Sequence, residues 1–166
     1  MDLRENHIES NRKKIIRYLY LISLFFLVLT GFGQMPVFKR YYIADIPGLG
    51  WLAQFFVTHY MHYLFAIFFF GITVFIITGY FLTHRKKIKI TPSGYIRGTI
   101  LFGLVITGTL LVIRNQASSN FPPDLIIFLD LSHLSLVMIF LMTGLYCLIF
   151  KKKWYSDKRN LSSKKG

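Results

Sequence analysis

The sequence contains a single cysteine, Cys147, and only 7 acidic residues against 20 basic ones. One cysteine excludes an internal disulfide, and it excludes any zinc or iron–sulfur site built from several cysteines of this chain. The scarcity of acidic residues leaves a net charge of +13, which is also typical of nucleic-acid-binding proteins. The basic residues lie between long apolar runs, however, where membrane topology and lipid headgroups account for them. Nucleic acid is therefore not an expected partner.

Apolar side chains are what the sequence has in abundance. Of its 166 residues, 54% are hydrophobic and 17% are aromatic, too many for the core of a water-soluble protein of this length. A helix needs about 20 residues to cross a bilayer, and four apolar stretches meet that length: 16–34, 55–82, 97–114 and 125–150. We therefore expect an all-α membrane protein, a four-helix transmembrane bundle over 16–150, with an N-terminal tail at 1–15 and a basic tail at 151–166. No internal repeat is evident.

The basic residues predict the orientation of the chain in the membrane. All of the 20 Lys and Arg residues except Lys39, Arg40 and Arg114 lie before or at the start of the first span, between the second and third spans or at the start of the third, or after the fourth. Because cytoplasmic loops are enriched in Lys and Arg, both tails should be cytoplasmic and the loops at 35–54 and 115–124 should face outward. The first apolar run ends without a small-residue cleavage site, so we expect it to be retained as an anchor. The expected location is the cytoplasmic (inner) membrane, as a multi-pass protein.

Three histidines, His59, His62 and His133, lie within or at the mouth of apolar spans. An ionisable residue in a span usually marks a pathway, a partner or a cofactor, although a neutral imidazole also serves as a hydrogen bond between helices. At 1.5 Å per residue, His133 and His62 lie about 27 and 31 Å from the cytoplasmic ends of their spans. His59 lies about 4.5 Å further out. Two level imidazoles from two spans suit the two faces of one haem b, which predicts His62 and His133 as iron ligands.

For several other residues near this level, the sequence allows more than one role. Arg40 and Arg114, with Lys39, are the cations available for haem propionates on the outer side, and interfacial snorkelling explains them equally well. Asp130 precedes His133 by three residues, which puts it on nearly the same face and about one turn further out. It is expected to hydrogen-bond an imidazole or to accept a proton from quinol, or else to lie in the wet interface without a role. Glycines in all four spans would allow a thin-walled haem slot: Gly31, Gly33, Gly71, Gly103, Gly108 and Gly144.

Four segments occur in an order and spacing that resemble a known family. They are "LFFLVLTGF" in the first span, "HYMHYLFAIFFFG" in the second, "VITGTLL" in the third and "LSHLSLVMIFLMTGLYC" in the fourth. Over residues 12–150 the chain resembles the four-helix cytochrome b subunits of respiratory formate dehydrogenases and membrane nickel–iron hydrogenases. Such subunits carry electrons between a peripheral iron–sulfur or catalytic partner and the quinone pool. The resemblance implies that His62 and His133 hold the outer of the family's two haems.

The chain departs from this family at the inner haem. The family has a histidine early in the first span and another about four turns after the first ligand of the fourth, whereas this sequence has "RYLY" (17–20) and Cys147 there. One haem b is therefore expected, and the family's quinone site, beside the inner haem, is in doubt. We expect an electron-transfer subunit with an extracytoplasmic iron–sulfur or cytochrome partner. His59 remains open as a substitute ligand or propionate partner. The alternatives are a haemless membrane anchor and a proton-conducting transporter that uses His62, Asp130 and His133.

Overall fold

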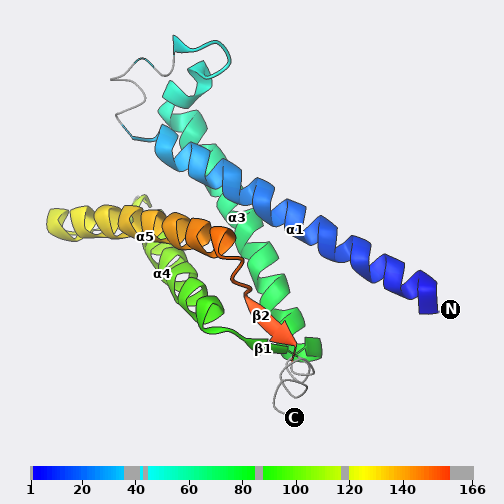
Figure 1. Cartoon of the computed structure of the whole chain (residues 1–166). Helices are drawn as coiled ribbons and strands as arrows, with labels where there is room; N and C mark the ends of the chain where they lie inside the picture. The colour runs from blue at the N-terminus through cyan, green and yellow to red at the C-terminus, as the bar shows by residue number, and fades with distance from the viewer. Residues whose placement is uncertain (1, 36–41, 43–44, 85–87, 117–119, 158–166) are drawn as a thin grey trace. The chain divides into compact units, whose positions relative to one another are not determined.

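The computed structural model describes residues 2–35, 42, 45–84, 88–116 and 120–157. Four long helices dominate this part of the chain: α1 (Asp2–Gly33), α3 (Phe55–Gly79), α4 (Pro92–Arg114) and α5 (Pro123–Ile149) (Figure 1). Within the described residues, each of the four contains a segment long and apolar enough to cross a membrane. The predicted class, an all-α membrane protein with four spans, is confirmed. The remaining elements are short: η2 (Gly50–Ala53), the π-helical η3 (Tyr80–His84), β1 (Ile88–Ile90) and β2 (Tyr155–Asp157).

Three helices begin earlier than the hydrophobic runs predict, and of these α5 begins at Pro123, close to the predicted 125. Helix α1 starts at Asp2 because the polar residues before position 16 include no proline or glycine and continue the helix beyond the apolar run. Helix α4 starts at Pro92, five residues before the predicted 97. Thr91 caps it, since its hydroxyl oxygen accepts a hydrogen bond from Gly94 N at 3.1 Å, and Pro92 occupies the first turn, where no N–H is needed.

The chain divides into two compact units, Met1–Phe81 and Leu82–Gly166. In the first unit, α1 and α3 pack along a ladder of four side-chain pairs: Gln34 with His59, Thr30 with His62, Phe26 with Phe65, and Tyr20 with Phe69. Residue numbers fall on α1 as they rise on α3, so the two helices run antiparallel. The pairs at the C-terminal end of α1 are polar, whereas Phe26 and Phe65 stack at 4.5 Å. The polar pairs that link the two helices are therefore at one end of the hairpin.

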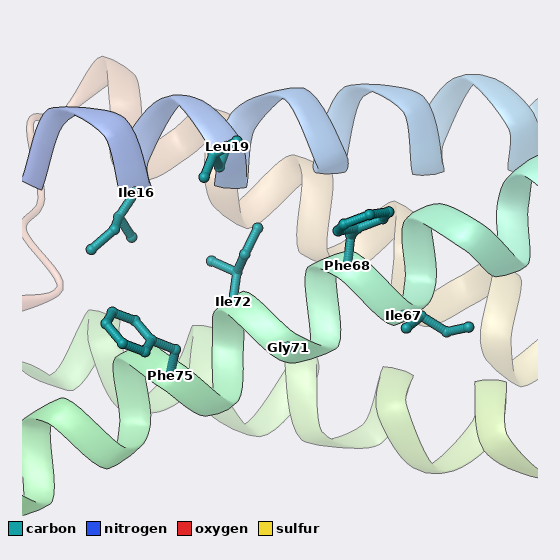
Figure 2. A pocket seen from close by; sticks show the side chains of 7 residues that line it. All are labelled: Ile16, Leu19, Ile67, Phe68, Gly71, Ile72 and Phe75. Carbon is teal, nitrogen blue, oxygen red and sulfur yellow. The ribbon is translucent and has the colours of Figure 1, made fainter. Parts of the chain in front are cut away.

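A groove of about 400 Å³ lies between α1 and α3, at the middle of α1 (Figure 2). It is lined by Ile16, Leu19, Ile67, Phe68, Gly71, Ile72 and Phe75. None of these side chains is polar, so the groove offers no group that would orient a quinone headgroup or bind a metal. The lining of the groove suits apolar chains and provides no polar side chain for catalysis.

In the second unit, α4 and α5 form another hairpin. Further contacts join the two chain segments at its open end, where α4 begins and α5 ends. Strands β1 and β2 pair antiparallel, with Lys89 opposite Ser156. Arg97 is buried; its guanidinium donates to the Lys152 carbonyl at 3.1 Å and lies 4.2 Å from the centre of the Trp154 ring. Basic residues near a span end are thus used for packing as well as for topology. The segment after α5, predicted as a basic tail, contains β2 in its described part.

Candidate functional site

The imidazole of His62 is held inside the first hairpin by one threonine. His62 is on α3, and its Nδ1 lies 3.0 Å from the hydroxyl oxygen of Thr30 on α1. Thr30 is fully buried. A Cβ placed on the next residue, Gly31, would lie 3.3 Å from Cε1 of the ring. A glycine therefore lets the imidazole lie close against the α1 backbone.

The imidazole of His133 makes two similar contacts in the second hairpin. Its Nδ1 lies 2.9 Å from the hydroxyl oxygen of Thr107, which is on the neighbouring helix α4. A Cβ on Gly108 would lie 3.4 Å from Cε1 of this ring. Each hairpin thus places the histidine of its second helix against a threonine–glycine dipeptide of its first.

Thr30 and Thr107 are functional candidates that the sequence interpretation missed. Threonine–glycine dipeptides occur once in every span, at 30–31, 78–79, 107–108 and 143–144. Cβ atoms built on Gly79 and Gly144 would meet nothing within 4 Å, whereas Gly31 and Gly108 face a histidine ring. The only available signal was the tetrapeptide Val-X-Thr-Gly, with X aliphatic, which begins at Val28 and again at Val105. That signal marks the two dipeptides that face histidines.

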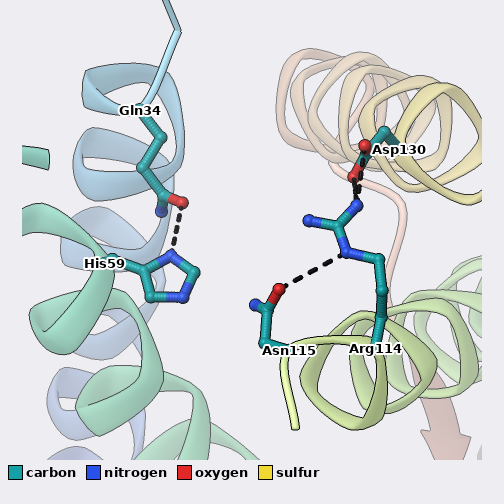
Figure 3. Close-up of polar contacts among 5 residues, drawn as sticks. All are labelled: Gln34, His59, Arg114, Asn115 and Asp130. Carbon is teal, nitrogen blue, oxygen red and sulfur yellow. Dashed lines mark hydrogen bonds and ion pairs between the residues drawn. The ribbon is translucent and has the colours of Figure 1, made fainter. Parts of the chain in front are cut away.

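His59 lies one turn from His62 and is also directed at α1. Its Nδ1 lies 3.0 Å from Oε1 of Gln34 (Figure 3). Because an amide oxygen only accepts, Nδ1 of His59 is the donor. The ring stacks on Phe55 at 5.3 Å and lies 4.4 Å from the ring of Tyr63. The surroundings of His59 are therefore aromatic and differ from those of His62 and His133.

Asp130 and Arg114 are brought together by the structure. Arg114 Nη1 donates to both carboxylate oxygens of Asp130, at 3.0 and 2.9 Å, and Arg114 Nε donates to the side-chain oxygen of Asn115 at 3.4 Å (Figure 3). Asp130 was expected to orient an imidazole or to accept a proton; the hydrogen bond at His133 Nδ1 joins it to the Thr107 hydroxyl. Asp130 is half exposed, with 52% of its side chain accessible, as suits an interfacial ion pair. Of the other predicted cations, Arg40 and Lys39 lie outside the described residues.

Each hairpin supplies one imidazole of the kind that ligates haem iron. Bis-histidine ligation needs one neutral imidazole per face, with the ring oriented by a hydrogen bond at its other nitrogen. His62 and His133 each have such a bond at Nδ1, to Thr30 and Thr107. In the described part of the chain, no three His, Cys, Asp or Glu side chains come together in a way that would hold a metal ion. Cys147, where the family has an inner-haem ligand, is buried in α5.

The chain was compared with protein-family models, curated proteins and solved structures, and it matches none of them. What can be said of its function therefore rests on the residues and geometry described above.

Proposed function

We propose that this protein is a membrane-bound b-type cytochrome subunit that binds one haem b through His62 and His133. The observation that carries the proposal is the equivalence of the two imidazoles. Each comes from the second helix of its hairpin, and each has its Nδ1 within 3.0 Å of a threonine hydroxyl and its Cε1 against a glycine. Two histidines that served only as unrelated links between helices would not be expected to share all three features.

The proposal extends to the role of the surrounding residues. His62 and His133 would hold the haem, which would supply one-electron transfer. Thr30 and Thr107 would fix the orientation of the two rings. Arg114 and Asp130 neutralise each other at the outer end of the second hairpin. Asp130 remains the candidate proton acceptor for a quinol, and protonation there would break its ion pair.

A haemless membrane anchor is the second candidate. The same hydrogen bonds, from His62 to Thr30 and from His133 to Thr107, also hold each hairpin together without a cofactor. Haem content distinguishes the two functions directly.

The haem content of the purified protein tests the proposal. We expect a pyridine haemochromogen assay, set against protein concentration, to give a ratio of about one haem b per chain, because each chain has one pair of equivalent imidazoles. Reduction should produce a sharp α band. A ratio near zero would establish the anchor function instead, and a ratio near two would mean that His59 or a ligand other than histidine supports a second haem.

The proposed redox partner is an extracytoplasmic iron–sulfur protein or cytochrome. The orientation expected from the basic residues puts the loops at 35–54 and 115–124 outside, nearest the level of His62 and His133. The chain also lacks the histidines that would bind an inner haem. A photo-crosslinking residue placed at Tyr42 or Asn120, both exposed, should therefore capture the partner.

The same crosslinker at Lys89 or Lys153, also exposed, is the matched control for the cytoplasmic side and should capture no redox partner. Capture of the partner from these two positions alone would refute both the proposed electron path and the orientation.

A further inference from the structure

Thr30 and Thr107 each have one hydroxyl hydrogen and three neighbours that compete for it: a histidine Nδ1 and two backbone carbonyls, of which the Leu27 and Leu104 carbonyls are the more distant, at 3.4 and 3.3 Å. Thr30 Oγ1 lies 2.6 Å from the Phe26 carbonyl oxygen, and Thr107 Oγ1 lies 2.9 Å from the Gly103 carbonyl oxygen. Both carbonyls are one turn back on the threonine's own helix. A carbonyl oxygen has no hydrogen to give, so it must receive the hydroxyl hydrogen if that bond is made.

This arrangement favours a proton on one of the two imidazole nitrogens. Once the threonine hydrogen points to the carbonyl, the hydroxyl oxygen has only lone pairs to offer the histidine. The Nδ1 atoms of His62 and His133, at 3.0 and 2.9 Å, must then be the donors. With a proton on Nδ1, a neutral imidazole has its lone pair on Nε2, which is the atom that binds a metal. The opposite tautomer would leave Nδ1 and two carbonyl oxygens as acceptors for one hydroxyl hydrogen in a part-buried place.

We propose that Thr30 and Thr107 are positioning residues that hold His62 and His133 as the Nδ1–H tautomer, with Nε2 as the ligand atom for haem iron. This rests on the proposed function for its last step. A hydrogen bond at Nδ1–H also increases the electron donation of the imidazole to iron, which stabilises the ferric state. The two threonines therefore set the reduction potential of the haem as well as the ring orientation.

The test replaces the hydroxyl without changing the shape of the side chain. Thr30→Val and Thr107→Val remove it, and Thr30→Ser and Thr107→Ser keep it. Thr73→Val and Thr109→Val are matched controls, because the hydroxyls of Thr73 and Thr109 donate to carbonyls on their own helices, those of Phe69 and Val105. All variants are full-length chains purified in detergent.

Two measurements are made on each variant. Long-range ¹⁵N–¹H spectra of the haem-free protein identify the protonated ring nitrogen. Redox titration of the haem-loaded protein gives the midpoint potential and the haem retained on dilution. Each Thr→Val change should produce mixed tautomers, raise the potential and weaken haem retention by about tenfold or more, the usual cost of losing such a partner. The serine variants should restore all three properties, and Thr73→Val and Thr109→Val should leave them unchanged.

Wild-type rings protonated on Nε2, or valine variants with an unchanged tautomer and potential, would overturn the positioning role. Wild type that binds no haem but shows threonine-dependent Nδ1–H tautomers would support the positioning role and refute the proposed function. The two proposals therefore fail in different ways.

Discussion

Replacement of His133 or His62 by alanine is expected to abolish low-spin haem. Each change removes one of the two proposed axial imidazoles, so the iron would be left five-coordinate or the haem would be lost. Loss of an outer-shell partner alone weakens metal binding by roughly 10- to 100-fold, so loss of the ligand itself should exceed that range. Optical and electron paramagnetic resonance spectra of the purified variants would report the change as loss of the low-spin signal and of the sharp reduced α band.

His59→Ala is the matched control for these variants. His59 lies three residues from His62 on the same helix, but its Nδ1 bonds to Gln34 and its ring stacks on Phe55. This variant should retain its low-spin haem, with at most a small shift in potential. If His59→Ala loses the haem and His62→Ala keeps it, then the ligand of the first hairpin is His59 and the equivalence of His62 with His133 has no bearing on haem binding.

Valine at Gly108 or Gly31 should weaken haem binding by about tenfold or more. The new Cβ would lie 3.4 or 3.3 Å from Cε1 of the adjacent ring, and the two further methyl groups of valine need space that the ring occupies. Overpacking of this kind costs about 1–3 kcal/mol, and ~1.4 kcal/mol is a factor of ten in affinity. Because the imidazole must rotate or withdraw, haem that remains bound should shift toward high spin, which optical titration with haem would measure.

Gly98→Val separates this effect from the general cost of valine in a helix. Gly98 is on α4, as is Gly108, but a Cβ there would meet nothing within 4 Å. Its haem affinity should equal that of the wild type. Equal losses in Gly98→Val and Gly108→Val would show that the contact between Gly108 and His133 is irrelevant to haem binding.

The sequence by itself determined the class of the protein and the position of its spans. Four apolar runs of bilayer length define four helices whatever their packing, because a helix in lipid satisfies its own backbone hydrogen bonds. The helix ends were predicted less well, since caps and polar extensions define them. Helix α1 continues to Asp2, and the Thr91 cap starts α4 at Pro92. The candidate histidines also came from sequence, because an imidazole in an apolar run is conspicuous.

Only the tertiary structure decided which residues meet these histidines. Spacing along one helix placed Asp130 on nearly the same face as His133, but the structure pairs it with Arg114, sixteen residues earlier. The sequence contains four threonine–glycine dipeptides, and the two at 30–31 and 107–108 face imidazoles. Neighbours on the same helix follow from its 3.6-residue period. Contacts with the other helix of the hairpin depend on how the two packed helices are rotated and offset. The spacing of residues within a single span does not specify that rotation and offset.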